Sequence, residues 1–293
     1  MQIQIQDLSM TYPSGKQALQ RLDLDLTSPS LVGLLGPNGA GKSTLMKLLV
    51  AALLPTQGSI LVDGRPLDRS QRALKARLGY LPQSFGLYDE LTVYQFLDYM
   101  AALKGLRNSR SAIDQVIRAV NLEEKRRARI RTLSGGQRQR VGIARALALN
   151  PEFIVCDEPI SALDVSIRAQ VLNLLNSMKK SRGLTYLFIA HDLSVVRFIS
   201  DRIAVISKGR IVELAEAEEL FLHPLHPYTK ALLSAVPIPD PGLEKKKKLL
   251  VYDPSIHDYS VDKPVWEEIA NGHFVYGNQK ELEGYRKEYQ SQL

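Results

Sequence analysis

One stretch of nine residues constrains the fold of this chain more than any other. Residues 36–44 read Gly-Pro-Asn-Gly-Ala-Gly-Lys-Ser-Thr and fit the phosphate-binding pattern G-x-x-x-x-G-K-[ST] at every fixed position. The apolar run 31–35 before them has the length of a buried strand, and residues 45–49 after them have helical spacing. This order predicts a site for nucleotide phosphates between a strand and a helix. A glycine-rich turn that binds nothing is the alternative.

The chemistry of this loop suits an anion. Its glycines let successive backbone N–H groups turn inward, and the start of the following helix adds the positive end of its dipole. Lys42 is expected to reach the terminal phosphates and the Ser43 hydroxyl to ligate the Mg²⁺ that accompanies them. The loop residues expected to bind the nucleotide are Gly36, Pro37, Asn38, Gly39, Ala40, Gly41, Lys42, Ser43 and Thr44.

Composition places the chain among ordinary globular proteins. With 45% hydrophobic and 24% charged residues, its 293 residues can bury a large core. The longest nearly apolar stretch, residues 45–54, is far shorter than the ~20 residues needed to cross a bilayer. The N-terminus alternates like a strand and lacks the pattern of a secretory signal, so we expect a cytoplasmic protein. The single cysteine, Cys156, lies in an apolar run and is expected to be a small buried hydrophobe.

The net charge of +7 does not by itself select a partner. The basic residues concentrate at 125–140 and 245–248, and neither run is interleaved with aromatic residues as a single-strand nucleic-acid platform would be. We therefore expect a solvated or phosphate-facing surface and no nucleic-acid partner.

The pattern along the chain predicts an α/β fold with several parts. Residues 1–30 alternate as in a small antiparallel sheet, and residues 92–121 have helical spacing. A helical subdomain is therefore expected at about residues 85–134, within a domain of residues 1–223. From residue 224 prolines punctuate an extension, residues 224–293. Strands are expected at 31–35, 59–62, 78–81, 153–156, 187–190 and 203–206. Strands alternating with helices predict a mostly parallel sheet, with ligands bound at the carboxyl ends of its strands.

Four further elements follow the phosphate-binding loop in order: Gln83, the sequence Leu-Ser-Gly-Gly-Gln at 133–137, Asp157-Glu158, and His191. With that loop, the Leu-Ser-Gly-Gly-Gln and Asp-Glu-Pro segments resemble the ATP-binding cassette (ABC) family, and the resemblance covers about residues 1–225. Each residue also has a structural interpretation when taken alone. Gln83 is then an ordinary loop residue, Glu158 a helix-capping carboxylate and His191 a histidine satisfied at a strand end.

The resemblance implies a P-loop ATPase that uses ATP and Mg²⁺. Glu158 would polarise the attacking water and His191 would steady the γ-phosphate, with Lys42 as the third catalytic group. Asp157 would hold Mg²⁺ together with Gln83 and Ser43. The resemblance also implies that Tyr12 stacks on adenine, although a tyrosine in a turn commonly only covers the core.

A second set of residues is implied to act across a dimer. In the family, the loop that opens the helix after residue 133 binds the γ-phosphate of ATP held by the opposite subunit. Unpaired N–H groups at a helix start suit that role. Asp164 would communicate between the two subunits. The loop consists of Leu133, Ser134, Gly135, Gly136 and Gln137.

The two halves of the chain resemble different branches of the family. From about residue 134 onward, including His-Pro-Tyr-Thr at 226–229, the chain resembles the ATP-binding subunits of oligopeptide and dipeptide importers. Residues 1–133 resemble exporter-type ATPases instead. A natural mosaic, an engineered fusion or an assembly error would each give this pattern. As a hypothesis, Phe85, Tyr88 and Tyr94 line the groove for a membrane partner; packing within the helical subdomain is the alternative for each.

The resemblance therefore implies an ATP-hydrolysing subunit at the cytoplasmic face of the membrane. Its expected partners are a second ABC ATPase subunit, in a homodimer or heterodimer, and transmembrane permease subunits. An importer would add an extracellular substrate-binding protein. Peptide import is the function expected first, ahead of drug or antibiotic export; a cytosolic ABC regulator without a membrane partner is a third candidate.

Overall fold

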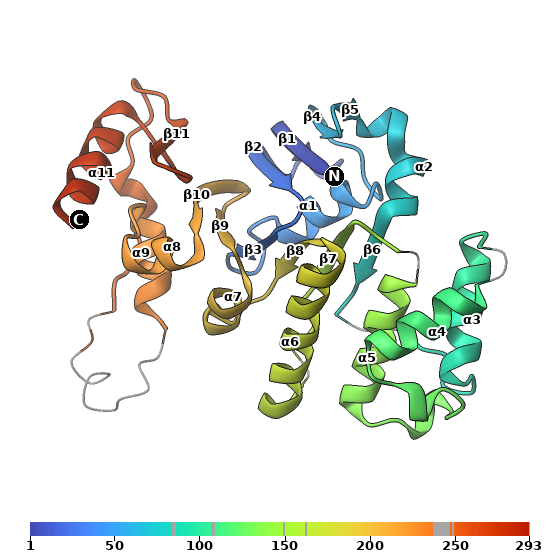
Figure 1. Cartoon of the computed structure of the whole chain (residues 1–293). Helices are drawn as coiled ribbons and strands as arrows, with labels where there is room; N and C mark the ends of the chain where they lie inside the picture. Colours follow the sequence, from blue (N-terminus) through green and yellow to red (C-terminus); the bar gives the residue numbers. More distant parts are fainter. Residues whose placement is uncertain are drawn as a thin grey trace.

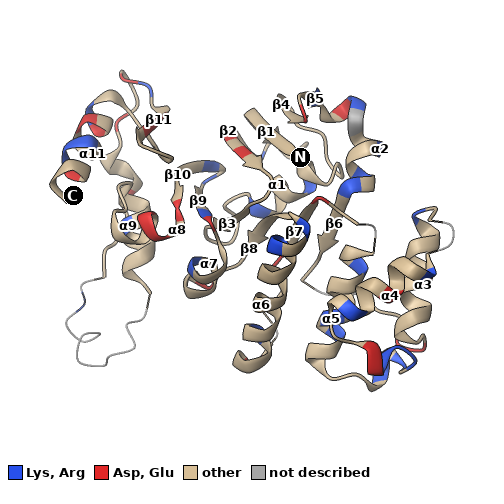
Figure 2. Ribbon diagram, viewed as in Figure 1, with Lys and Arg blue, Asp and Glu red and all other residues tan. Residues whose placement is uncertain are grey.

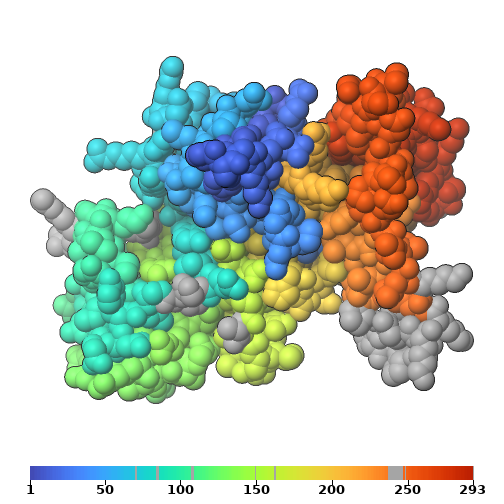
Figure 3. Space-filling view, turned by 180° about the vertical axis from the view of Figure 1, so that it is seen from behind, coloured from blue at the N-terminus to red at the C-terminus, as the bar shows by residue number. Residues whose placement is uncertain are grey.

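The computed structural model describes residues 1–83, 86–106, 109–148, 150–161, 163–236, 247 and 249–292, without the side chain of Ser70. Figure 1 shows a sheet core with the C-terminal extension on one side and the helical subdomain on the other. The space-filling view from behind shows the same arrangement, with the N-terminal strands between these two parts (Figure 3). Phe85, expected in a partner groove, lies outside the described residues, as do Lys245, Lys246 and Lys248.

The N-terminal residues form the expected small antiparallel sheet. Ile3 and Ile5 alternate with exposed or half-buried neighbours, which places one face of the sheet in the core. The strand expected at 59–62 joins this sheet and pairs with β1. In spatial order its strands are β2 (Gln17–Thr27), β1 (Gln2–Thr11), β4 (Gln57–Val62) and β5 (Arg65–Pro66).

The main sheet is mostly parallel, as the sequence predicts. β9, β3, β8, β7 and β6 are neighbouring parallel strands, whereas β10, β12 and β11 continue the sheet in antiparallel pairs. Every residue of β3 and β8 is buried because layers of structure cover both faces. In spatial order the strands are β11 (Val265–Ala270), β12 (His273–Gly277), β10 (Arg210–Glu216), β9 (Arg202–Ser207), β3 (Leu31–Leu35), β8 (Thr185–Ile189), β7 (Phe153–Asp157) and β6 (Leu78–Leu81).

The two faces of this sheet belong to two separate apolar clusters. Phe153 and Val155 pack with the N-terminal sheet and α1, whereas Ile154 and Cys156 point to the opposite, helix-covered face. Cys156 is fully buried, as expected, and burial raises the pKa of its thiol. The helices around the core are α1 (Lys42–Leu49), α2 (Leu67–Arg77), α5 (Gly135–Leu147), α6 (Val165–Arg182) and α7 (Leu193–Ile199).

The helical subdomain contains two helices where the sequence predicts one helical stretch. They are α3 (Val93–Leu103) and α4 (Arg110–Ala119), followed by the 3-10 turns η1 (Glu123–Lys125) and η2 (Ile130–Thr132). Thr92 begins α3 with a reciprocal capping box that involves Gln95. Phe96 and Leu97 of α3 are buried, whereas Leu103, the last residue of the helix, is exposed.

Several arginines of the basic run 125–140 serve as ion-pair partners inside this subdomain. The pairs join Arg126 to Asp114 at 2.8 Å, Arg131 to Glu90 at 3.1 Å and Arg138 to Asp89 at 2.6 Å. Figure 2 shows basic and acidic residues interspersed over the same helices and loops. The run is therefore partly neutralised where it lies.

The C-terminal extension is joined to the main sheet. β12 pairs with β10 through Glu213↔Val275 and Leu214↔Phe274. Its other elements are α8 (Ala217–Leu222), α9 (Pro227–Ser234), η3 (Pro254–Ile256) and α11 (Gln279–Gln292). Within α9, residues 231–233 are half-buried, whereas Thr229 is fully buried. The division of the chain after residue 223 remains a prediction. None of the described helices is both long enough and apolar enough to cross a membrane.

Candidate functional site

The phosphate-binding loop connects β3 to α1, as predicted, and its glycines have separate steric roles. Gly39 and Gly41 have φ of 82° and 110°, in the left-handed region that favours glycine. A Cβ on Gly41 would lie 2.7 Å from the carbonyl oxygen of Ala18, and one on Gly36 would lie 2.3 Å from that of Ile206. The backbone therefore reaches this conformation only with glycine at these positions.

A cavity of about 250 Å³ lies over the loop and the start of α1. Asp157 and Glu158, at the carboxyl end of β7, form part of its wall, so the two predicted halves of the site meet here. Ligands in open α/β sheets bind at this end of the strands. The other lining residues are Tyr12, Lys16, Ala18, Asn38, Gly39, Gly41, Lys42, Ser43, Thr44 and Ile189.

The Lys42 side chain lies within the loop and is only 8% exposed. Its Nζ donates to the carbonyl oxygens of Gly36 at 2.6 Å and Pro37 at 3.0 Å. Burial lowers the pKa of Lys42, and the nearby Glu158 and Asp157 partly oppose that shift. An anionic ligand would therefore find a desolvated ammonium group at the base of the cavity.

Asp157 and Glu158 place two adjacent carboxylates in the wall of the cavity, with Lys42 as the cation that acts on Asp157. Burial raises the pKa of Asp157, and the adjacent Glu158 raises it further, with only Lys42 acting in the other direction. Ser43, the first-turn hydroxyl of α1, lines the same cavity as Asp157. Among the described residues, no group of three or more His, Cys, Asp or Glu side chains could hold a metal ion. This donor set fits Mg²⁺, which usually binds one or two carboxylates together with substrate phosphates and water.

Glu158 is the point where three predicted residues come together. Its Oε2 accepts a hydrogen bond from Gln83 Nε2 at 3.1 Å and lies 3.4 Å from His191 Nδ1. Gln83 follows β6 and His191 follows β8, so neighbouring parallel strands supply all three side chains. Glu158 itself has φ of 46°, an uncommon conformation for a non-glycine residue. Such outliers cluster at functional sites.

Tyr12 lies beside the loop, directly after β1. Its hydroxyl hydrogen-bonds the Thr44 hydroxyl at 3.1 Å, and its half-buried ring packs against the core beneath the cavity. The ring therefore covers part of the core, as the alternative interpretation of the sequence expected. The same ring also lines the cavity, which leaves adenine stacking as a prediction.

Residues 133–137, predicted to act across a dimer and called the partner-facing loop below, do not line this cavity. Ser134 begins α5 through a capping box: its hydroxyl accepts from the Gln137 amide at 3.4 Å, and the Gln137 side chain accepts from the Ser134 amide at 3.1 Å. Leu133 is buried, while Ser134 and Gly135 are exposed. The loop is thus anchored on one side and open on the other, where the first amides of α5 face solvent.

Asp164 caps α6 in this structure. Its carboxylate accepts from the Ile167 amide at 3.0 Å and the Ser166 hydroxyl at 3.0 Å, and these bonds lower its pKa. On the next turn, Arg168 pairs with Asp192 at 3.1 Å. Because Asp192 caps α7 directly after His191, this ion pair connects the start of α6 to the histidine loop.

Sequence reasoning missed residues that support the site from outside the motifs. Gln139, 5% exposed, donates to the carbonyl oxygen of Pro159 and so joins α5 to the segment after Glu158. Lys16 and Ala18 belong to the cavity wall. Lys16 could have been identified from the sequence, because it is a basic residue in the turn that follows Tyr12. No local sequence pattern could have identified Gln139, because its hydrogen-bond partner, Pro159, lies outside α5.

Models of two protein families match the chain. The family described as ABC transporter matches residues 19–161. The family described as oligopeptide/dipeptide transporter, C-terminal region, matches residues 212–261. The first match contains the phosphate-binding loop and Asp157-Glu158; the second begins within β10 and continues into the extension.

Two curated proteins are similar to the chain over nearly its whole length. The oligopeptide transport ATP-binding protein OppF of Streptococcus pyogenes serotype M1 is 45% identical over 314 residues, covering 98% of this chain and 98% of OppF. The oligopeptide transport ATP-binding protein AmiF of Streptococcus pneumoniae serotype 4 is 47% identical over 305 residues, covering 97% of each chain. Both matches span the two halves that resemble different branches of the family.

A solved structure with a similar fold is the dimeric post-hydrolysis state of the ATP-binding cassette MJ0796, bound to ADP and Pi. The TM-score is 0.64 and the sequence identity 28%, over 73% of this chain and 98% of that one. The likeness therefore covers the whole of a cassette and leaves about a quarter of this chain outside it.

Proposed function

Because the chain belongs to the ABC family of transporter ATPases, we propose that it is the ATP-hydrolysing subunit of a peptide importer. ATP binding and hydrolysis coupled to transport follow from the family. Peptide import is supported by one observation above all: relatives named as oligopeptide transport ATP-binding proteins share 45–47% identity with the chain over nearly its full length. A single kind of relative thus accounts for both halves of the sequence.

Nucleotide binding is assigned to the loop and its neighbours. The amides around Gly39 and Gly41 and the start of α1 would hold the phosphates, where Lys42 adds its positive charge. The Lys42 ammonium would exchange its carbonyl partners for phosphate oxygens, which are stronger, charge-assisted acceptors. Tyr12 is assigned to adenine, because its ring lies at the wall of the same cavity.

Magnesium is assigned to Ser43, Asp157 and Gln83. When bound, the ion would neutralise charge on the phosphates. Ser43 and Asp157 line the same cavity. Gln83 donates a hydrogen bond to Glu158, which also lines it. The raised pKa of Asp157, caused first by burial and then by the adjacent Glu158, supports this assignment, because a bound cation would favour the ionised carboxylate.

We assign Glu158 to orient the water that attacks the terminal phosphate. His191 and Gln83 are assigned to hold the Glu158 carboxylate in position. The Glu158 side chain already has a fixed place, because two side chains from neighbouring strand ends contact the same oxygen. A carboxylate held in this way can orient and polarise a water for attack on the terminal phosphate. His191, 66% exposed at its side chain, remains free to contact that phosphate.

The partner-facing loop 133–137 requires a second subunit. The loop does not line the cavity of its own chain, and its exposed helix start is suited to an anion. We assign it to the ATP of a second ABC subunit in a head-to-tail dimer, with Asp164 near the contact. The dimeric cassette with ADP and Pi is a precedent for this assembly in a related fold.

The membrane partners are permease subunits, and the chain itself is assigned to the cytoplasmic face of the membrane. If it serves an importer, an extracellular binding protein would deliver the peptide. The Tyr88 and Tyr94 surface of the helical subdomain is the proposed contact for the permease. Tyr88 is 51% exposed and packs edge-on against Tyr99.

Co-purification tests the proposal. The Glu158→Gln variant is expected to bind ATP without hydrolysing it, to form a stable dimer, and to be captured by the membrane subunits of a peptide importer. Exporter membrane subunits are tested in parallel, with Glu124→Gln, an exposed glutamate on η1, as the control that keeps ATPase activity. Capture by exporter subunits alone would replace import with export. Capture by neither would contradict a transport role.

A further inference from the structure

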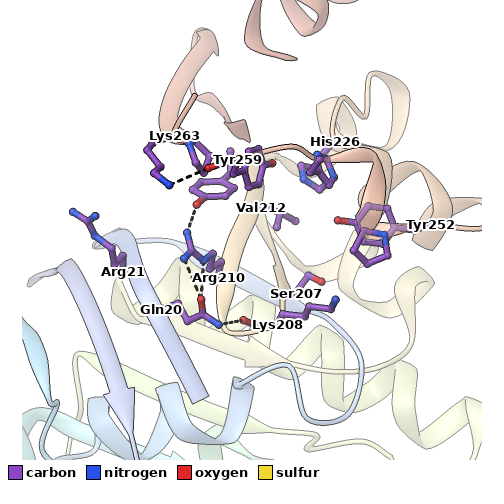
Figure 4. Close-up of a pocket in the computed structure, with 14 residues that line it drawn as sticks. Gln20, Arg21, Ser207, Lys208, Arg210, Val212, His226, Tyr252, Tyr259 and Lys263 are labelled. Carbon is purple, nitrogen blue, oxygen red and sulfur yellow. Dashed lines mark hydrogen bonds between the residues drawn. The ribbon is translucent and has the colours of Figure 1, made fainter. Parts of the chain in front are cut away.

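A second, larger cavity lies between the sheet core and the C-terminal extension (Figure 4). Its volume is about 600 Å³, compared with about 250 Å³ over the phosphate-binding loop. The core contributes residues of β2 and of the turn between β9 and β10, including Gln20 and Lys208. The extension contributes Tyr252, Tyr259 and Lys263. The volume is within the usual range for a small-molecule site.

The charges that line this cavity are all positive. Arg21, Lys208, Arg210 and Lys263 contribute to its wall, and no Asp or Glu is among the described residues that line it. Arg21 is paired with Asp7 at 2.7 Å, but Arg210 contacts the neutral side chains of Gln20 and Tyr276. Neither Lys208 nor Lys263 has a carboxylate within 4.0 Å in the part of the chain described. The cavity is therefore suited to an anion.

Aromatic rings supply much of the remaining wall. The His257 ring is stacked between His226, at a centroid distance of 5.2 Å, and Tyr259, at 5.4 Å. Tyr252 packs against both histidines, and Tyr276 lies edge-on to Tyr259. Flat, largely apolar surfaces of this kind stack well on planar rings. A ligand that combines a ring with a negative group would match both properties of the wall.

One polar atom in this wall lacks a partner. The His257 side chain is 6% exposed; its Nδ1 lies 2.6 Å from Glu281 Oε1, but its Nε2 has no hydrogen-bond partner among the described residues. Buried polar groups without partners are rare in folded proteins, and each calls for an explanation. Because Nε2 has almost no accessible surface, it marks an unsatisfied polar group enclosed within the aromatic wall.

We propose that this cavity is a second ligand site, for an aromatic phosphate monoester of about mononucleotide size. The phosphate is expected beside Lys208 and Arg210. The neighbouring cavity, which shares Arg21, Arg210 and Lys263, includes Asp7 and Asp23 in its wall, whereas Lys208 lines only the larger cavity, so an anion is favoured on the Lys208 side of Arg210. The ring is expected against the side chain of Tyr252, beside the stacked histidines.

The site is connected to the phosphate-binding loop by main-chain hydrogen bonds. The Gly209 amide donates to the carbonyl oxygen of Ala40 at 2.8 Å, and the Gly209 carbonyl accepts from the Gln20 amide at 2.9 Å. The Gln20 side chain in turn bonds the Lys208 carbonyl and Arg210. A ligand held by Lys208 and Arg210 would therefore change the affinity for nucleotide, and nucleotide would change its affinity equally. This step rests on the proposed function of the loop.

Calorimetric titration of the full chain with 1-naphthyl phosphate tests the site. Inorganic phosphate and 1-naphthol are titrated separately, and MgADP saturates the first site. We expect one molecule of 1-naphthyl phosphate per chain, bound at least tenfold more tightly than either fragment. Lys208→Gln and Tyr252→Leu should each weaken binding about tenfold. Lys287→Gln, which removes an exposed lysine of α11 outside the cavity, should leave binding unchanged.

The outcomes separate the parts of the proposal. Absence of 1-naphthyl phosphate binding, or binding unaffected by Lys208→Gln, would overturn the site. Equal affinity for inorganic phosphate would overturn recognition of the ring. Equal affinity for 1-naphthyl phosphate with and without MgADP would overturn the connection to the loop. A chain unable to bind MgADP would contradict the proposed function instead, and the titration of the nucleotide-free chain would still test the second site.

Discussion

At the scale of single residues, the nucleotide site contains charges that oppose folding in the absence of a ligand. Asp157 is partly buried beside Glu158, and burial is the main reason that its pKa is raised. Burial likewise lowers the pKa of Lys42. Both shifts mean that the ionised form is less favourable in the folded chain than in the unfolded one. The site is thus arranged for ions that arrive with the substrate, at some cost to the stability of the empty protein.

We predict that Asp157→Asn raises the melting temperature of the nucleotide-free chain while reducing ATPase activity. Because the folded pKa of Asp157 lies above the ordinary value of 3.8, stability is lost as pH rises from that value through the folded pKa. The gain from the substitution should therefore be largest above the folded pKa, as at pH 8, and vanish below pH 3.8. Thermal unfolding at these pH values measures it. A melting temperature lowered at pH 8 would contradict the prediction.

The two interactions of Tyr12 can be separated by a pair of substitutions. Tyr12→Phe removes the hydrogen bond to Thr44 but keeps the ring, so nucleotide affinity should change less than about threefold. Tyr12→Ala removes the ring, and since base–aromatic stacking contributes about 1–3 kcal/mol per base, affinity should fall by about 5- to 150-fold. Fluorescent ADP titration measures both. Equal losses in the two variants would assign Tyr12 to positioning Thr44 instead.

At the scale of elements, α5 and α6 hold the partner-facing loop by close packing. A Cβ on Gly136 would lie 2.6 Å from Ile167 Cγ2, whereas a Cβ on Gly135 would meet nothing within 4 Å. Two adjacent glycines of one motif therefore have different physical reasons to be glycine. One lets α5 approach α6 closely, and the other leaves open space at the exposed helix start.

We predict opposite stability effects for alanine at these two positions. Gly136→Ala should destabilise the chain by about 1–3 kcal/mol, the usual cost of overpacking. Gly135→Ala should be neutral or stabilising by up to about 1 kcal/mol, since alanine favours helix over glycine. Urea unfolding measures both differences, and Gly135→Ala is the matched control. Equal destabilisation of the two variants would show that α5 and α6 are not packed as described.

The elements also show what could be inferred from the sequence. The strand and helix around the phosphate-binding loop and the strand ending at Asp157 were identified because their signals are local: continuous apolar runs bounded by glycine or acidic residues. The hairpin of β11 and β12 was not identified, although Asn271-Gly272 between its strands is a strong turn signal. The contact of Glu158 with His191 joins residues at the ends of separate strands; the family resemblance implied a role for each residue but did not predict the contact.

At the scale of the whole molecule, one buried carboxylate holds the C-terminal extension to the core. Glu213, on β10, is fully buried and accepts from the Leu225 amide at 2.7 Å and the His226 amide at 3.1 Å. His273 Nε2, on β12, lies 2.8 Å from the same carboxylate. Figure 2 shows acidic residues on β10 and at the start of α8. The hydrogen-bond partners of Glu213 are 12 to 60 residues away in the chain, so no local sequence pattern could identify the role of this residue.

Replacing that carboxylate should loosen the extension without unfolding the ATPase core. Glu213→Gln keeps the size of the side chain. It replaces one of the two carboxylate oxygens with an NH₂ group, although each of these oxygens accepts a hydrogen bond from a main-chain N–H. We expect a local destabilisation of about 2–4 kcal/mol, because the lost hydrogen bonds are charge-assisted and buried. Hydrogen exchange should increase in residues 265–292 but not in β3, β7 or β8. The control is Glu216→Gln, at an exposed position of the same strand. Unchanged exchange in residues 265–292 would show that β12 pairing and the small cluster of Leu225, Val275, Leu282 and Tyr285 are sufficient to hold the extension.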